Sequence, residues 1–160
     1  MKRCKSIFVL FLSMFLGVML MANEKQPEYA IVIHGGAGSV TTDPVIIAAR
    51  KEVLKQALEI GVATLEENGT SLDAVEKVIR ILEDSPLFNA GRGGVLTAKG
   101  NNELDATIMN GKTRACGAVG GVTRVKNPIS LARKVMTETR HVLLVSEGAD
   151  VFATQLDDPM

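Results

Sequence analysis

The sequence predicts a mixed α/β domain of the α+β type, in which helices flank one sheet with mixed or antiparallel pairing. Three observations predict this class: a central hairpin signal, two short apolar β-branched runs, and three helix starts marked by a capping residue. The expected order is strand, two helices, two hairpin strands, helix, strand and helix, which argues against a doubly wound parallel sheet. With 160 residues, of which 46% are apolar and 22% charged, the chain can bury one real core.

The N-terminal half predicts one strand and two helices. The run at 30–33 is apolar and β-branched and stops at glycine, as a buried strand does. Asp43 followed by Pro44 begins a long amphipathic helix, which Asn68-Gly69 ends. Thr70 or Ser71 caps a second helix, whose apolar stripe consists of Leu72, Val75, Ile79 and Leu82.

The C-terminal half predicts a hairpin and then helix, strand and helix. Asn110-Gly111 separates two strand-like segments, and a two-residue Asn-Gly connection is typical of a type I′ hairpin turn. Asn127 and Pro128 begin another helix, the run at 141–146 predicts a buried strand, and the last helix begins at Glu147.

The first 22 residues predict export. Three basic residues (Lys2, Arg3 and Lys5) precede an uncharged run from Ser6 to Ala22, the pattern of a secretory signal peptide cleaved near Ala22. We expect an exported, periplasmic protein; the alternative is an uncleaved membrane anchor, because the apolar run is slightly long. Removal of this segment leaves Cys116 as the single cysteine, so no internal disulfide can form.

The residues alone do not assemble a catalytic set. Eighteen basic residues balance eighteen acidic ones without a basic stripe, which excludes a nucleic-acid footprint. His34 and His141 are far apart and no metal-ligand spacing occurs. Asp105 lies in a predicted strand whose apolar neighbours suggest a partly buried carboxylate, which would need hydrogen-bond partners; the alternative is that it simply holds a loop by hydrogen bonds. Cys116 is either a nucleophile or a small packing residue.

Besides the HGGAG stretch at 34–38, glycine is concentrated in two places. The stretch SPLFNAGRGGVL, residues 85–96, follows a helix and has no Lys-Ser/Thr, so it is not a phosphate loop. The second cluster, Gly117, Gly120 and Gly121, predicts close packing of a helix on the sheet or close approach of a ligand.

Taken in order, IVIHGGAG, PLFNAGRGGVLT, ELDATIMNG, GAVGGV, NPISLAR and HVLLVSEGA resemble the plant-type L-asparaginase / isoaspartyl peptidase family, from Tyr29 to Ala153. The resemblance implies an N-terminal-nucleophile hydrolase: an αββα sandwich, made as a precursor that cuts itself in two and exposes a threonine. That threonine lies in a G-T-V-G-like motif, which would follow Met160. Residues 23–160 therefore resemble only the N-terminal (α subunit) part, truncated before the nucleophile.

The resemblance also implies a function. The full-length enzyme would hydrolyse β-aspartyl dipeptides and the side-chain amide of asparagine, and this fragment alone would be inactive. None of Thr107, Thr113 and Thr123 lies in the matching motif. Two alternatives stay open: N4-(β-N-acetylglucosaminyl)-L-asparaginase, and a truncated remnant that serves as a non-catalytic module.

The site residues follow from the same resemblance. Asn89 would line the active site, and the turn at His34, Gly35 and Gly36 would assist autoproteolysis. No catalytic cofactor is expected, and the partners would be the missing β subunit, in an (αβ)2 assembly, and a small substrate. A structural sodium ion would be bound by the main-chain carbonyls of Leu82, Glu83, Ser85, Phe88, Ala90 and Arg92.

Overall fold

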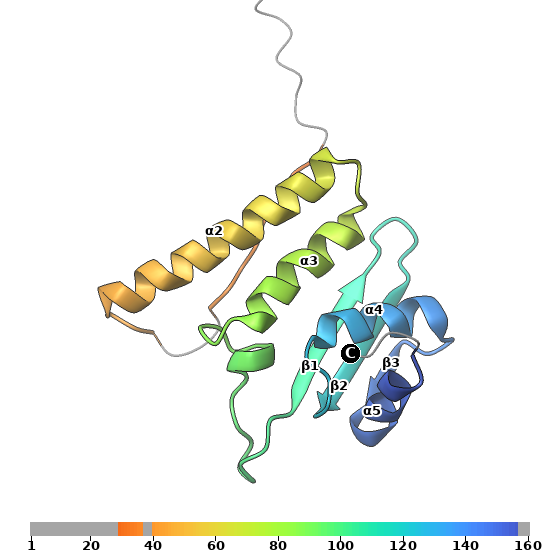
Figure 1. The fold of residues 1–160 in the computed structure, drawn as a ribbon. Helices are drawn as coiled ribbons and strands as arrows, with labels where there is room; N and C mark the ends of the chain where they lie inside the picture. Colours follow the sequence, from red (N-terminus) through yellow and green to blue (C-terminus); the bar gives the residue numbers. More distant parts are fainter. Residues whose placement is uncertain (1–28, 37–39, 157–160) are drawn as a thin grey trace, which may run out of the picture. The chain divides into compact units, whose positions relative to one another are not determined.

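A computed structural model describes residues 29–36 and 40–156, so the predicted signal peptide lies outside the described residues. Figure 1 shows helices α2 (Pro44–Glu66), α3 (Ser71–Asp84), α4 (Pro128–Glu138) and α5 (Ser146–Thr154), a 3₁₀ turn η1 (Gly91–Gly93), and strands β1 (Leu104–Met109), β2 (Cys116–Val122) and β3 (Leu143–Val145). All belong to one compact unit that begins at Ile31. Within the described residues, no helix combines the length and apolarity needed to cross a bilayer.

Both N-terminal helices begin where the sequence predicted. The Asp43 carboxylate accepts the Val45 N–H at 2.8 Å, with Pro44 in the first helical turn. At α3, Thr70 and Asp73 form a reciprocal capping box: Oγ1 of Thr70 accepts the Asp73 N–H, and the Asp73 carboxylate accepts the Thr70 N–H at 2.9 Å. Asn68 ends α2 in the left-handed region, at φ 64°.

Helices α2 and α3 pack along each other around Ala57, Val78, Leu82 and Phe88. Residues 31–36 lie against this pair but have no regular secondary structure, so the buried strand predicted at 30–33 is wrong for this chain. Ile31 joins this core, whereas Val32 is 93% exposed. The alternation of a strand is present, but none of β1, β2 and β3 pairs with the segment.

The predicted mixed sheet is confirmed, with strand order β1-β2-β3. β1 and β2 are antiparallel, whereas β2 and β3 are parallel. The predicted two-residue turn is wrong: Met109 pairs with Cys116, and residues 110–115 connect the strands. The Asn110 carboxamide oxygen accepts the N–H groups of Lys112 and Thr113, which widens the turn, and Arg114 takes the positive φ of 63°.

A bulge explains part of the glycine cluster in β2. Leu104 pairs with Val122 and Ala106 with Val119, so Gly120 and Gly121 together oppose Asp105. Gly121 has a φ of 62°, and its N–H donates to the Asp105 carboxylate at 2.8 Å. Asp105 therefore holds the backbone by a hydrogen bond, as one hypothesis stated, although its side chain is exposed rather than partly buried.

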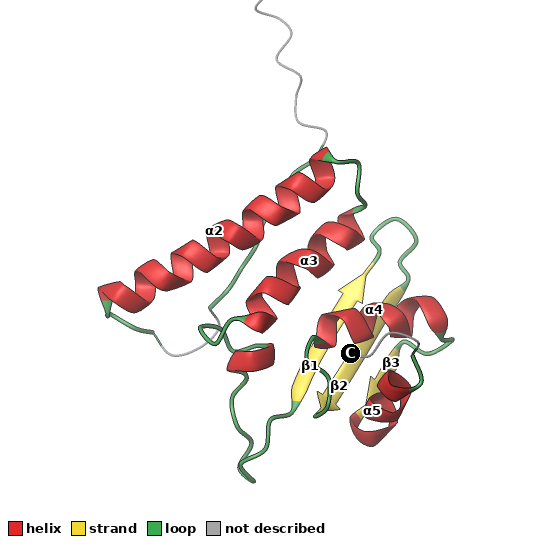
Figure 2. Cartoon of the chain, viewed as in Figure 1, coloured by secondary structure: helices red, strands yellow, loops and turns green. Residues whose placement is uncertain are grey.

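Helices α4 and α5 cover one face of the sheet (Figure 2). A Cβ on Gly117 would overlap the Ala132 carbonyl oxygen and lie 2.5 Å from the Met136 nitrogen, so this glycine permits close packing of α4. The core consists of Ile108, Val119, Val122, Val125, Ile129, Leu131, Ala132, Val135, Ala149 and Ala153.

The opposite face of the sheet is not covered by any described element. Met109, Leu143 and Val145 are 57%, 54% and 53% exposed on it, and Cys116, the partner of Met109 in the ladder, is a half-buried free thiol. The buried strand predicted at 141–146 is thus shorter than expected, and only its half-buried Leu144 packs against the core. We call the surface formed by Thr107, Met109, Cys116, Ala118, Leu143 and Val145 the open sheet face.

Candidate active-site loop

The loop at residues 85–96 is anchored to both N-terminal helices. Helix α3 stops at Asp84 because Pro86 follows, and the buried Ser85 hydroxyl accepts the Leu87 N–H at 3.3 Å. The Leu87 carbonyl accepts the Arg50 Nε–H from α2 at 3.2 Å. These bonds fix the direction in which the chain leaves α3.

The loop and the glycine turn at 34–36, which are about fifty residues apart in sequence, meet at Phe88. Phe88 is 6% exposed in the core between α2 and α3, and a Cβ on Gly35 would lie 2.7 Å from its ring. Gly36 needs its own freedom, since its φ is 137°. The structure therefore brings together two of the segments that the sequence singled out. His34, beside them, is exposed.

Asn89 follows the buried Phe88 and lies at the surface of the loop. Its Oδ1 accepts the Val95 N–H at 3.0 Å, so the carboxamide joins the two ends of the glycine-rich stretch. Phe88 anchors the residue from the core side and Val95 from the loop side. A polar side chain held in this way is oriented before any ligand arrives.

The predicted sodium ligands lie at the end of α3 and within the same loop. The Phe88 carbonyl accepts the Ala90 N–H at 2.9 Å, and the Ala90 carbonyl accepts the Gly93 N–H at 3.0 Å. A Cβ on Gly91 would overlap the Glu83 carbonyl oxygen, and one on Gly93 would overlap that of Phe88. Glycine at these two positions thus lets the loop backbone approach these carbonyl oxygens closely.

The Glu83 side chain lies beneath the loop, and the sequence singled out only the main-chain carbonyl of this residue. It is 3% exposed, and its Oε1 accepts the Ile129 N–H in the first turn of α4 at 3.0 Å. Asn127, the capping position by sequence, donates to Asp84 instead, so Glu83 caps α4 from 46 residues away. Within the described residues, Oε2 has no hydrogen-bond partner. Burial raises the pKa of Glu83 to about 7, and the Ile129 N–H opposes this.

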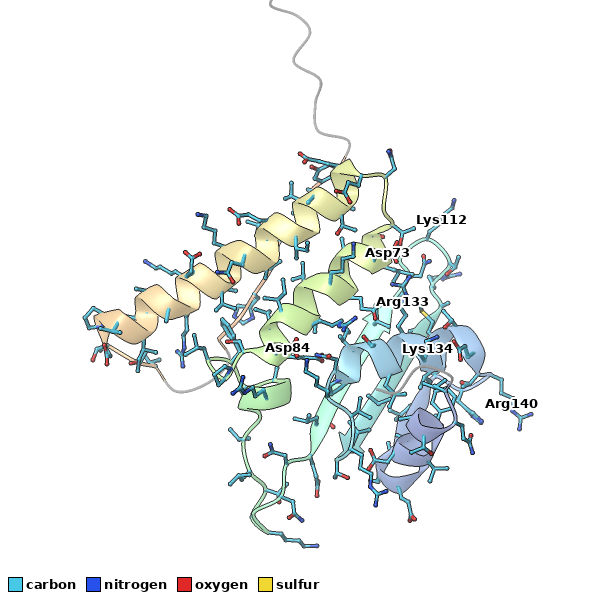
Figure 3. The ribbon with its side chains drawn as sticks, viewed as in Figure 1. Asp73, Asp84, Lys112, Arg133, Lys134 and Arg140 are labelled. Atoms are coloured by element: carbon cyan, nitrogen blue, oxygen red, sulfur yellow. The ribbon has the colours of Figure 1, made fainter. Side chains whose placement is uncertain are left out.

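A second polar cluster joins α3 to α4 beside the capping box (Figure 3). The Arg133 guanidinium donates to Asp73 and to Glu76, each at 2.6 Å, and the Ser130 hydroxyl donates to Glu76. Hydrogen bonds from the Thr70 side chain, and then from Arg133, lower the pKa of Asp73 to about 2. Each charge in the cluster has a partner, which is typical of a structural link.

The remaining sequence candidates do not converge. His141 is exposed after α4, far along the chain from His34, and the described part of the chain holds no group of three His, Cys, Asp or Glu residues suited to a metal ion. The Thr107 and Thr123 hydroxyls donate to Gly117 and Asp150, and that of Thr113 accepts a local N–H. Each of these three hydroxyls is thus engaged in a hydrogen bond within the described fold.

The sequence model of a protein family described as Asparaginase matches residues 27–160. The chain belongs to this asparaginase family. Its similarity to individual members of the family is high. It is 52% identical over 133 residues to the plant-type L-asparaginase of Pyrococcus horikoshii, and these aligned residues make up 81% of this chain and 42% of that protein.

Two further relatives agree. The Arabidopsis thaliana protein named probable isoaspartyl peptidase/L-asparaginase 2 is 51% identical over 129 residues, covering 78% of this chain and 39% of its own length. The isoaspartyl peptidase/L-asparaginase of Danio rerio is 42% identical over 132 residues, covering 81% and 41%. This asparaginase-family chain thus spans about two fifths of the length of these relatives. The matched region contains both the glycine turn and the Asn89 loop.

Proposed function

We propose that the protein to which this chain contributes hydrolyses β-aspartyl dipeptides and the side-chain amide of L-asparagine. The observation that carries the proposal is the identity of about one half to relatives whose names state these activities, across four fifths of the chain. The geometry supports it, since the loop that presents Asn89 is preorganised and lies against the glycine turn.

In this proposal the chain supplies one wall of the site and the nucleophile comes from elsewhere. A threonine at a newly formed N-terminus attacks the amide carbonyl, and its own α-amine takes the proton. Ammonia or an amino acid leaves, and water then releases aspartate from the acyl-enzyme. Asn89 lines this site, and the turn at His34, Gly35 and Gly36 lies near the bond that is cut during maturation.

We further propose that the open sheet face packs against a second sheet, which completes an αββα sandwich and belongs to the β subunit in an (αβ)2 assembly. Three of its apolar side chains, Met109, Leu143 and Val145, are more than half exposed in the described chain. Sheets that stack face to face bury such side chains between them. If the β subunit also supplied a strand to pair with residues 31–34, this pairing would explain why exposed and half-buried residues alternate there.

The six carbonyls named above are proposed to bind a structural sodium ion that holds the loop in shape. The close approach of Gly91 and Gly93 to the Glu83 and Phe88 carbonyl oxygens, which gathers neutral oxygen atoms in one short loop, supports this assignment. Export to the periplasm remains our proposal for the segment 1–22, and fractionation of cells that produce the protein would test it.

The decisive experiment extends the gene beyond the codon for Met160 and assays the purified product. We expect a self-cleaved protein that releases aspartate from β-aspartyl-leucine and ammonia from asparagine, whereas the 160-residue chain releases neither. Cleaved protein that is inactive on both, but active on glycosylasparagine, would favour the glycan-cleaving alternative. A stop codon at this position, with no activity, would favour the non-catalytic module.

Two variants of the extended protein test the role of Asn89. Asn89→Asp keeps an oxygen that can accept the Val95 N–H, whereas Asn89→Ala loses this bond. If Asn89 contacts the substrate, both variants lose at least about tenfold in kcat/KM, while the Asp variant unfolds near the wild-type temperature. Equal losses of activity and thermal stability, confined to the Ala variant, would make Asn89 a purely structural residue.

A further inference from the structure

The sequence holds two Asn-Gly pairs, Asn68-Gly69 and Asn110-Gly111, and the structure places them in different environments. An asparagine side chain can be attacked by the backbone nitrogen of the next residue, and glycine in that position offers no side chain to obstruct the reaction. The attack needs a backbone nitrogen that is not engaged, room for a five-membered ring, and access of water. These three conditions can be compared at the two pairs.

At the first pair the attacking nitrogen is engaged. The Gly69 N–H donates to the Thr64 carbonyl at 2.8 Å as α2 ends, and the Asn68 N–H donates to the Leu65 carbonyl. A Cβ on Gly69 would lie 2.6 Å from that Thr64 oxygen, so the glycine is also crowded. The end of the helix therefore protects Asn68.

At the second pair the conditions are reversed. Gly111 is exposed, a Cβ there would meet nothing within 4 Å, and among the described hydrogen bonds none uses its N–H. The neighbouring bonds pass around it, because the Asn110 carboxamide oxygen accepts the N–H groups of Lys112 at 2.9 Å and Thr113 at 3.2 Å. Two donors on this oxygen draw electrons from the carboxamide carbon and fold the side chain over the backbone that follows it.

We propose that Asn110 is a site of spontaneous modification to isoaspartate. The Gly111 nitrogen forms a bond to the Asn110 carboxamide carbon, the bond from that carbon to the amide nitrogen breaks, and the displaced proton leaves with ammonia. Water then opens the cyclic imide to isoaspartate or aspartate. The reaction needs only water and does not depend on the proposed function.

The modification changes the hairpin rather than the sheet. Isoaspartate routes the main chain through the side chain and adds a negative charge at 110. The bonds it disturbs are those of Asn110 to Ala115 and Arg114, at 2.8 and 2.7 Å, which close the connection outside the ladder. The last ladder pair, Met109 with Cys116, stays in place.

Incubation of the purified folded protein at mildly alkaline pH, followed by peptide mapping, tests the proposal. We expect the peptide that contains Asn110 to gain the mass of amide-to-acid conversion at least ~10-fold faster than the peptide that contains Asn68. The reason is that the attacking nitrogen of Gly69, unlike that of Gly111, must first lose a backbone hydrogen bond. Labelling by an isoaspartyl methyltransferase identifies the β-linked product. In urea the two rates should converge, because the difference arises from the fold.

Two variants complete the test. Asn110→Gln should abolish the product in its peptide, and Gly111→Ala, for which there is open space, should slow its formation without unfolding the protein. Equal rates at Asn110 and Asn68 in the folded protein would overturn the proposal. The proposal would also be overturned if folding slowed the reaction, relative to urea, by the same factor at Asn110 as at Asn68.

Discussion

Replacement of Glu83 by glutamine should make the protein more stable at neutral pH, because it removes a carboxyl group that is buried. The Glu83 carboxyl is 3% exposed, and burial raises its pKa from the ordinary 4.5 to about 7. A raised pKa means that the folded protein prefers the protonated form. This contribution to stability is complete below pH 4.5 and is lost as the pH rises through about 7.

The magnitude follows from the two pKa values. The difference between 4.5 and about 7 corresponds to about 3 kcal/mol in the free energy of unfolding, lost between mildly acidic and mildly alkaline pH. Glutamine keeps an oxygen for the Ile129 N–H but cannot ionise. Relative to the wild type, Glu83→Gln should therefore gain up to about 3 kcal/mol as the pH rises from about 5 to about 8.5.

Urea denaturation at several pH values measures this gain directly. Subtracting the free energy of unfolding of the wild type from that of the variant cancels the titration of other groups. The change of this difference with pH does not depend on any constant cost of burying the amide. Glu67→Gln, at the exposed end of α2, controls for the loss of one negative charge. A wild-type-to-variant difference that does not change with pH, or that grows toward acid, would refute the reasoning.

Three further predictions concern packing, strain and charge. Gly117→Ala should lower the free energy of unfolding by more than ~2 kcal/mol, because the added methyl group overlaps a carbonyl of α4. Gly111→Ala should change this free energy by less than ~0.5 kcal/mol, and urea denaturation of the two variants compares them. Ser146→Gly should raise the melting temperature by relieving about 1 kcal/mol at a φ of 49°, and a lower temperature would contradict this. Arg133→Ala should destabilise the protein by ~1 kcal/mol or more at neutral pH. In this variant the free energy of unfolding should also fall less as the pH drops from 3.8, the ordinary pKa of Asp73, to about 2, its pKa in the folded wild type.

Features set by residues close in sequence were predictable. Asp43 and Pro44 lie next to each other, and Thr70 and Asp73 form their capping box across three residues, so the helix starts could be found from spacing alone. The hairpin itself was predictable for the same reason. Its turn was not, because the side chain of Asn110 competes with the two-residue geometry by accepting the N–H groups of Lys112 and Thr113.

Features set by distant residues were not predictable. The strand-like run at 30–33 alternates as a strand should, but a strand exists only where a neighbour supplies its ladder. Gly35 looked like a turn residue, and its contact with Phe88 depends on how the loop returns over α2. The sequence gave no signal for the role of the Glu83 side chain, since its partner Ile129 is 46 residues away.

The buried carboxylate and the candidate active-site loop form one packed unit, because Gly91 rests on the Glu83 backbone while the Glu83 side chain reaches α4. Gly91 has a φ of 48° and no room for a Cβ, so this part of the loop cannot shift without the end of α3. Asn89 lies two residues before Gly91. Asn89 is thus attached to the end of α3, the point at which the Glu83 carboxyl group is buried and burial raises its pKa to about 7.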